Sequence, residues 1–198
     1  METIICLIRH GQTDWNSKSL IQGTRDNPLN NTGRDQARQT AKLLKEFNIE
    51  YDVLMSSPLS RAYETMEIIK SELNYLKDIY TLDELKEREF GELEGKQVCT
   101  ESYRLMLTDS VKGLEQLPDL QKRSITAIKK IAEDYPNKKV LVTTHSQVIK
   151  GALSYLLPDF DFEYVIKNSS LNFFKVVDGK VMPLAYDINE YDENLIIK

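Results

Sequence analysis

Hydrophobic and polar positions along the chain follow two periods in turn, as is typical of strands followed by helices. Residues 4–8 form a continuous apolar run, the pattern of a strand that is covered on both faces. A polar stretch of roughly residues 11–31 follows, and apolar positions then recur at helical spacing from Ala37 to Phe47. Thr32 and Asp35 stand three residues apart, which predicts a helix start with Thr32 as the cap.

The same alternation continues as far as Leu156. Residues 52–55 predict a second strand, and Ser57-Pro58 predicts a helix start with Ser57 as N-cap and Pro58 at the first helical position. Further strands are expected at 80–82 and 140–144, and further helices at about 119–135 and 148–156. Residues 92–117 have no clear period, so we expect a loop or short helices over one side of the sheet.

The chain closes with two alternating runs, 171–177 and 181–186, and Asp178-Gly179 between them is a hairpin signal. Strands that alternate with helices predict an α/β fold, a three-layer sandwich with a mostly parallel central sheet and helices on both faces. The hairpin adds an antiparallel edge. The sequence shows no internal repeat or linker, so a single domain is expected over residues 1–198.

Composition narrows the possible functions by exclusion. With 26 basic and 31 acidic residues, the net charge of −5 leaves no basic face for nucleic acid. Two cysteines and two histidines provide no zinc-ligand spacing. The N-terminus lacks the basic region of a signal peptide, and no apolar run reaches the roughly 18 residues of a membrane span. We therefore expect a cytoplasmic protein with no nucleic-acid or membrane partner.

Both histidines directly follow apolar strands, in Arg9-His10-Gly11 and in Thr144-His145-Ser146. Ligands of open α/β sheets bind at the carboxyl ends of the strands, so the two histidines predict one shared pocket. Arginine matches phosphoryl oxygens with two hydrogen bonds, and a neutral histidine nitrogen can attack phosphorus. Gly11 would let the backbone approach the oxyanion. Arg61, in the first turn of the predicted helix, can reach the same anion.

A proton donor for a leaving alkoxide is the fourth element of such chemistry. The segment 84–91 offers three candidates, Glu84, Glu87 and Glu89. Each feature taken alone is more often structural: an arginine on a solvated helix face, a satisfied terminal histidine, a solvated charge run. The hypothesis of phosphate chemistry therefore depends on all four features occurring in order within one α/β pattern.

Taken together, these motifs resemble the histidine phosphatase superfamily, in its phosphoglycerate mutase-like branch. Matching segments extend over roughly residues 4–152, and the final hairpin also fits. The matching motifs are Arg9-His10-Gly11, Gln12 to Asn16, Gln22-Gly23, Asp26 to Leu29, Gly33 with Gln36-Ala37, Ser56 to Thr65, Leu85 to Gly91, Glu94-Gly95 and Thr144-His145-Ser146.

The resemblance implies that His10 is the nucleophile, phosphorylated on its outer ring nitrogen. It also implies that Glu87 protonates the leaving group and later activates water, because Glu87 aligns with the family's glutamate before Arg-x-aromatic-Gly. Neither a metal nor an organic cofactor is implied. The substrate would be a small phosphorylated metabolite.

The remaining family positions form the expected phosphate site. By resemblance, Arg9, Arg61 and His145 hold the phosphoryl oxygens, Asn16 adds a side-chain donor and Gly23 adds a backbone donor. Monomers and homodimers both occur in the family, so either oligomeric state fits.

Departures from the family pattern bear on the reaction. Ser146 replaces a common glycine, Leu93 stands where many phosphatases have tryptophan, and the Gly-Glu-Ser segment common before the helix that precedes the second histidine is missing. The insert after Gly95 is short and lacks the proline run and paired arginines with which mutases enclose a bisphosphoglycerate. This favours a hydrolase over a cofactor-dependent phosphoglycerate mutase.

Two other classes of function agree less well with the sequence. A non-catalytic phosphate-binding module on the same fold would have no need for both a nucleophile and an acid. A nucleotide-binding protein is disfavoured because the chain has no Walker loop or GxGxxG motif. Residues 17–31 and 92–117 are expected to set specificity. Tyr103, Arg104 and Lys112 are possible lining residues, although a solvated loop explains them as well.

Overall fold

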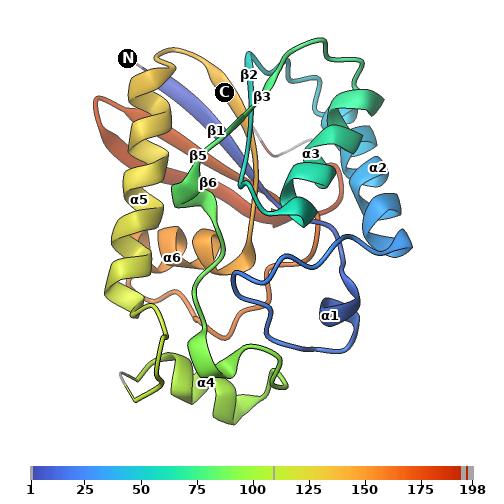
Figure 1. The fold of residues 1–198 in the computed structure, drawn as a ribbon. Helices are drawn as coiled ribbons and strands as arrows, with labels where there is room; N and C mark the ends of the chain where they lie inside the picture. The colour runs from blue at the N-terminus through green and yellow to red at the C-terminus, as the bar shows by residue number, and fades with distance from the viewer. Residues whose placement is uncertain (1, 109, 193–194, 196–198) are drawn as a thin grey trace.

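A mixed six-stranded sheet forms the centre of the computed structural model, which describes residues 2–108, 110–192 and 195 (Figure 1). The two ends of the predicted domain, at 1 and 198, lie outside the described residues. The strands stand in the order β3-β2-β4-β1-β5-β6. Their bounds are β1 Glu2–Arg9, β2 Val53–Ser56, β3 Ile79–Thr81, β4 Lys139–Thr144, β5 Leu171–Val177 and β6 Lys180–Ile188.

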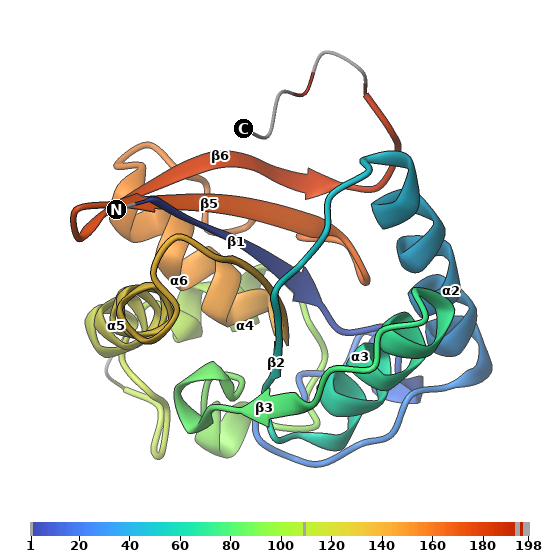
Figure 2. The same ribbon diagram turned by 90° about the horizontal axis from the view of Figure 1, so that it is seen from above.

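Helices cover both faces of this sheet, which confirms the predicted three-layer architecture (Figure 2). Helices α5 and α6 lie on one face, and α2 and α3 lie on the other. The helices are α1 Asp14–Ser17, α2 Asn31–Glu46, α3 Ser60–Glu72, α4 Thr100–Met106, α5 Leu117–Asp134 and α6 Ser146–Leu156, with short 3₁₀ turns at Asp83–Leu85 and Gly91–Leu93.

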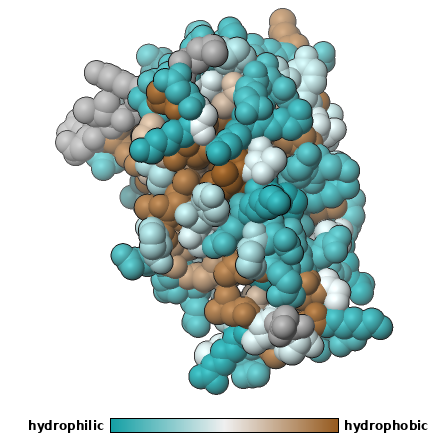
Figure 3. Space-filling view, turned by 90° about the vertical axis from the view of Figure 1, so that its left-hand side faces the viewer, coloured by the Kyte–Doolittle hydropathy of each residue, from teal (hydrophilic) through white to brown (hydrophobic). Residues whose placement is uncertain are grey.

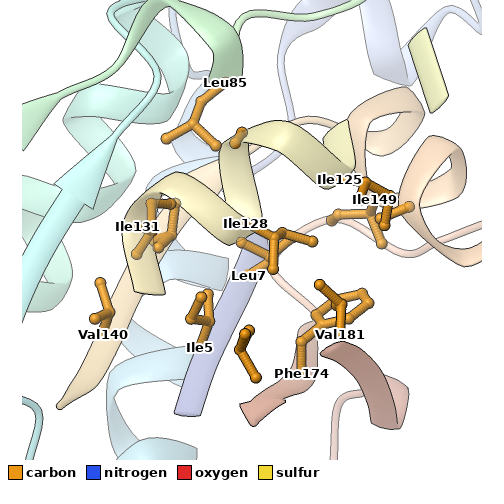
Figure 4. Close-up of a cluster of buried hydrophobic side chains, with 14 of the residues drawn as sticks. Ile5, Leu7, Leu85, Ile125, Ile128, Ile131, Val140, Ile149, Phe174 and Val181 are labelled. Atoms are coloured by element: carbon orange, nitrogen blue, oxygen red, sulfur yellow. The ribbon is translucent and has the colours of Figure 1, made fainter. Parts of the chain in front are cut away.

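Side chains of the central strand β1 divide between two hydrophobic cores. Ile5 and Leu7 pack beneath α5 and α6, as Figure 4 shows, whereas Cys6 and Ile8 pack beneath α2 and α3. Successive strand side chains point to opposite faces, so a strand buried on both sides must be apolar at every position. This explains the continuous apolar run that identified the strand.

Strand direction brings several chain segments to one edge of the sheet. Strands β3, β2, β4 and β1 are parallel, β5 is antiparallel to β1, and β6 is antiparallel to β5. The predicted antiparallel edge is therefore confirmed, with β5 as its reversed strand. The carboxyl ends of β1, β2 and β4 meet at one edge, and α1 and α4 lie beyond it (Figure 1).

The predicted start of α2 was wrong by two residues. Asn30, not Thr32, is the N-cap, and its side-chain oxygen accepts the backbone N–H of Gly33 at 2.9 Å. Asparagine caps helices at least as well as threonine, so Asn30 can serve as the cap two residues before Thr32. Asp35 instead pairs with Arg38 on the exposed surface.

The predicted cap of α3 was also wrong. The helix begins at Ser60, and Leu59 is an N-cap without a side-chain hydrogen bond. Asp26, from a distant loop, supplies the missing acceptor, since its Oδ1 accepts the backbone N–H of Ser60 at 2.7 Å. The hydroxyl of Ser57 is directed instead toward His145.

Residues 92–117 form short elements, as expected from their lack of period, and helix α4 is the longest of them. A third, smaller apolar cluster of Ile21, Phe90, Leu93, Met106 and Leu114 fixes this segment over the carboxyl edge. The four-residue helix α1 lies within the stretch expected to be a loop.

The surface is mostly hydrophilic on the side drawn in Figure 3, with apolar side chains gathered in separate patches. Among the residues that the structure describes, no helix is both long and apolar enough to cross a membrane.

Candidate active site

The predicted site residues converge at the carboxyl edge of the parallel strands. His10 follows β1, His145 follows β4 as the N-cap of α6, and Arg61 is the second residue of α3, which follows β2. Glu87 follows the 3₁₀ turn after β3. Parallel strands with helical crossovers thus bring residues 135 positions apart in sequence into one site, as the strand pattern predicted.

His10 is held in a definite orientation and protonation state. Its Nδ1 lies 2.7 Å from the carbonyl oxygen of Gly11, which accepts the Nδ1–H of the neutral imidazole. Nε2 therefore keeps its lone pair, and the Nε–H of Arg61 donates to it at 3.2 Å. Burial, together with the positive charges of Arg61 and Arg9, holds the pKa of His10 well below its usual range. These surroundings favour a neutral ring whose free lone pair is on Nε2.

The two arginines are fixed by backbone carbonyls. Arg61 is fully buried, and its Nη1 and Nη2 donate to the carbonyls of Arg25 and Gly23 at 2.7 and 2.8 Å. Arg9 donates through Nη1 to the carbonyl of Ile166, and its buried Nε has no protein partner among the described residues. Neither arginine forms an ion pair with a carboxylate in the described part of the chain, so both keep positive charge for an anion.

Glu87 is the buried carboxyl group of the site. Its Oε1 accepts the backbone N–H groups of Arg88 at 3.0 Å and Gln147 at 3.2 Å. Burial raises its pKa, opposed by the charge of Arg61 and the Arg88 N–H. Burial is the largest of these causes, so Glu87 has the raised pKa that a general acid requires.

His145 lies behind the ring of His10, with the two ring centroids 5.1 Å apart. It is fully buried and does not itself line the cavity. Its Nε2 is 2.8 Å from the hydroxyl of Ser57, and its buried Nδ1 has no protein partner among the described residues. Burial and the charge of Arg61 hold its pKa well below the usual value. The sequence interpretation cast His145 as proton-bearing, whereas its surroundings here favour the neutral ring.

Asn16 and Gly23 also lie at the cavity. The Oδ1 of Asn16 accepts the backbone N–H of Thr13 at 3.1 Å, in the capping box at the start of α1. The Nδ2 of Asn16 takes no part in this capping box. Gly23 has a left-handed backbone (φ 59°), and a Cβ there would overlap the carboxylate of Glu94. Its carbonyl accepts from Arg61, so Gly23 positions that arginine. Its backbone donation to substrate stays a prediction.

Apart from His145, the predicted site residues line a cavity of about 310 Å³. Of the three candidate glutamates, Glu87 lines it, whereas Glu89 is exposed. The full lining comprises Arg9, His10, Asn16, Ser19, Leu20, Ile21, Gln22, Gly23, Arg61, Glu87, Phe90, Val98, Tyr103, Met106, Ser146, Gln147, Lys150, Val165 and Asn168. Tyr103 therefore lies at the cavity, and Arg104 and Lys112 are exposed.

Gly11 serves a purpose different from the one its position suggested. A Cβ on Gly11 would overlap the carbonyl of Gly33, and a Cβ on Gly33 would overlap the backbone of Gln12. The N–H of Gly11 donates to the hydroxyl of Thr65 at 3.1 Å rather than pointing to an open anion site. The two glycines thus permit close contact between the loop after β1 and the start of α2.

Sequence reasoning missed several supporting residues. The Nδ2 of Asn168 donates to the carbonyl of His10 at 2.9 Å, from 158 positions away. Thr65 and Ser57 hold Gly11 and His145. Ser57 and Thr65 were visible within a motif but had no evident partner, and Asn168 carried no local signal. Lys150, buried in the cavity wall, was overlooked because it stands within an amphipathic helix pattern.

No group of three or more His, Cys, Asp and Glu side chains in the described part of the chain is arranged to hold a metal ion. Positive charge in the cavity comes from Arg9, Arg61 and Lys150.

The chain belongs to the histidine phosphatase superfamily (branch 1), whose family model matches residues 5–187. This confirms the resemblance found in the motifs.

Relatives within the family are named either as phosphatases or as phosphoglycerate mutases. The chain is 35% identical over 194 residues to the uncharacterized phosphatase PhoE of Bacillus subtilis strain 168, covering 96% of both chains. It is 32% identical to a 2,3-bisphosphoglycerate-dependent phosphoglycerate mutase of Thermoplasma acidophilum, covering 92% of both. Among solved structures, Bacillus stearothermophilus YhfR is 26% identical, with a TM-score of 0.80 over 96% of this chain and 98% of that one.

Proposed function

We propose that the protein is a metal-independent phosphomonoesterase that forms a phosphohistidine intermediate on His10. The observation that carries the proposal is the state of His10. Its Nδ1–H is tied to the Gly11 carbonyl, and its unprotonated Nε2 shares a cavity with two arginines and a buried carboxyl group. A neutral imidazole beside fixed positive charge is suited to attack a phosphate monoester.

In the first step, Arg9 and Arg61 bind the phosphoryl oxygens. His145 adds a third donor on the family pattern: its Nδ1 has no protein partner among the described residues, and its ring centroid lies 5.1 Å from that of His10. The lone pair of His10 Nε2 forms the N–P bond as the P–O bond to the leaving group breaks. Glu87 transfers its proton to the leaving oxygen, which departs as an alcohol. Positioning and charge complementarity supply most of the acceleration in phosphoryl transfer.

The second step reverses these roles. Glu87, now a carboxylate, takes a proton from water while the water oxygen attacks phosphorus. The N–P bond breaks, inorganic phosphate is released, and His10 regains its neutral form. Burial then favours the protonated form of Glu87 for the next cycle.

The alternative within the family is a cofactor-dependent phosphoglycerate mutase, the activity for which the Thermoplasma acidophilum relative is named. A mutase must exclude water from its phosphohistidine long enough to return the phosphoryl group. Here the segment between the 3₁₀ turn at Gly91–Leu93 and α5 has one seven-residue helix, α4, as its longest element. Such a short cover favours hydrolysis, in agreement with the name of the relative that is 35% identical.

The test is release of inorganic phosphate in the presence of EDTA. The panel is 3-phosphoglycerate, 2,3-bisphosphoglycerate, α-ribazole phosphate and p-nitrophenyl phosphate, with His10→Ala as control. We expect metal-independent release that disappears in the variant. Conversion of 3- to 2-phosphoglycerate without release would make the protein a mutase. Phosphate binding without either reaction would support the non-catalytic module.

A further inference from the structure

One charged group in the cavity has no part in the proposed phosphoryl transfer. Lys150, in the middle of α6, is 1% exposed and lies in the cavity wall with Arg9, His10 and Glu87. Lysine is almost never fully buried without a partner, because removing its ammonium from water costs several kcal/mol. A buried lysine at the wall of a substrate cavity therefore requires an explanation.

The groups in direct contact with this ammonium are neutral. Its Nζ donates to the carbonyl oxygen of Phe162 at 2.8 Å and lies over the rings of Tyr103 and Phe162, 5.1 and 5.3 Å from their centroids. Within the described ranges no carboxylate forms an ion pair with it. A carbonyl and two aromatic faces hold a cation in place but do not neutralise it. Two of its three N–H donors stay available to a ligand.

We propose that Lys150 is a specificity-determining residue that binds a second anionic group, a carboxylate or second phosphate, on the alcohol part of the substrate. The substrate class would be small phosphomonoesters that carry this second negative charge. This inference rests on the proposed phosphatase function. The placement fits because Arg9 and Arg61 take the reacting phosphoryl group, and Lys150 extends the positive charge along the same cavity toward Tyr103.

Surrounding charges define when the lysine is cationic. Burial lowers the pKa of Lys150 to about 8, with a further lowering by Arg9 and opposing contributions from three carboxylates. The titratable groups that face it are Arg9, Glu87, Tyr103, Asp161 and Glu163. At neutral pH the side chain is mostly cationic, and it becomes neutral as the pH rises through about 8.

The test compares two esters that differ at one group, 3-phosphoglycerate and glycerol 3-phosphate, in which a hydroxymethyl group replaces the carboxylate. We expect wild-type kcat/KM at pH 7 to favour 3-phosphoglycerate by about tenfold to a hundredfold, the range of one charge-assisted hydrogen bond. Lys150→Met should remove most of this ratio, whatever its effect on either absolute rate. Lys129→Met, which removes an exposed lysine of α5, should leave the ratio unchanged. 2,3-Bisphosphoglycerate shows whether a second phosphate serves as well as a carboxylate.

Two further measurements keep the proposal testable if Lys150→Met does not fold or wild type does not turn over the pair. The wild-type ratio should fall as the pH rises from 7 to above 8, since both esters ionise alike and the difference reports the lysine. Calorimetric binding of the same pair to His10→Ala should show the same preference without chemistry. A ratio near one in wild type, or one unaffected by both Lys150→Met and pH, would overturn the proposal. Preferential binding without any phosphate release would overturn the phosphatase assignment alone.

Discussion

At the residue scale, the two histidines differ in which ring nitrogen is occupied. His10 has Nδ1 tied to a carbonyl and Nε2 directed to Arg61, whereas His145 has Nε2 beside Ser57 and Nδ1 without a partner in the described residues. The hydrogen bond at one nitrogen sets the tautomer and hence the role of the other. This difference suits His10 to attack on phosphorus and His145 to hydrogen-bond donation, the roles that the proposed function gives them.

The acid role of Glu87 makes a leaving-group prediction. Glu87→Gln should slow alkyl phosphates by about 10²–10⁴-fold, the usual contribution of general acid catalysis, and slow p-nitrophenyl phosphate much less. An alkoxide needs a proton in order to depart, whereas nitrophenolate does not. Initial rates on both esters give the comparison, with Glu89→Gln, at an exposed neighbour, as the matched control. Equal slowing of both esters would remove the acid role.

The pKa shifts of His10 and Glu87 predict the shape of the pH profile. Glu87 must be protonated for the first step, so kcat/KM for an alkyl phosphate should fall as the pH rises through its raised pKa. His10 must be neutral, and its lowered pKa means that this requirement is lost only in more acidic solution. Activity should therefore be highest between the lowered pKa of His10 and the raised pKa of Glu87, and should decline at higher pH as Glu87 loses its proton. The alkaline decline of wild type should disappear in Glu87→Gln; its persistence there would show that another group titrates.

At the element scale, the start of α3 depends on a loop that is distant in sequence. Asp26 caps the N–H of Ser60, and the adjacent carbonyls of Gly23 and Arg25 hold the guanidinium of Arg61. Loop and helix thus define the position of Arg61 together. Arg61 is therefore fixed in the first turn of α3 because the loop that accepts its hydrogen bonds also caps that helix.

Removal of this cap should affect both stability and phosphate binding. Asp26→Ala should lower the free energy of unfolding by about 1 kcal/mol, the usual value for an N-cap. It should also raise KM, since the loop that holds Arg61 is released. Asp26→Asn keeps the Oδ1 acceptor and serves as the control. Urea unfolding and steady-state kinetics measure the two effects; a stability loss with unchanged KM would separate the cap from the site.

The elements also show how far the sequence could predict the structure. Continuous apolar runs identified β1 and β4 because both faces of these strands are buried, and helical spacing identified α2 and α5. The cap of α3 was misplaced because its acceptor, Asp26, comes from a distant loop. At α2 the error was local, since Asn30 rather than Thr32 accepts the N–H of Gly33.

A similar limit applied to the candidate site. The histidine, arginine and glutamate positions of the site could be predicted from the sequence, because each follows a strand or opens a helix in a recognisable motif. Asn168, which holds the carbonyl of His10, and Lys150, which lies within an amphipathic pattern, required the tertiary structure. Long-range hydrogen bonds and the burial of a single charge leave no period in the sequence.

At the scale of the whole molecule, one sheet is shared by two hydrophobic cores. Strands β1, β4 and β5 contribute to both, so neither core can form while the other is unfolded. We expect a single cooperative unfolding transition observed by calorimetry and by circular dichroism. Two separate transitions would contradict the predicted single domain.

Ligand binding should stabilise the whole domain through its site. Inorganic phosphate at 100 times its Kd should add about 2.7 kcal/mol to the free energy of unfolding, because it binds the folded state. Arg61→Met should show a much smaller increase at the same phosphate concentration. Thermal unfolding with and without phosphate measures this. An equal increase in the variant would place phosphate elsewhere on the protein.

The most direct test of the central claim locates the phosphoryl group during turnover. Glu87→Gln, which slows attack by water, is mixed with p-nitrophenyl phosphate and quenched in alkali, where phosphohistidine survives. Peptide mapping by mass spectrometry then finds the modified residue. The account predicts one phosphoryl group on the peptide that contains His10, and none in the variant that also carries His10→Ala. A phosphoryl group on His145 or any other residue would contradict it.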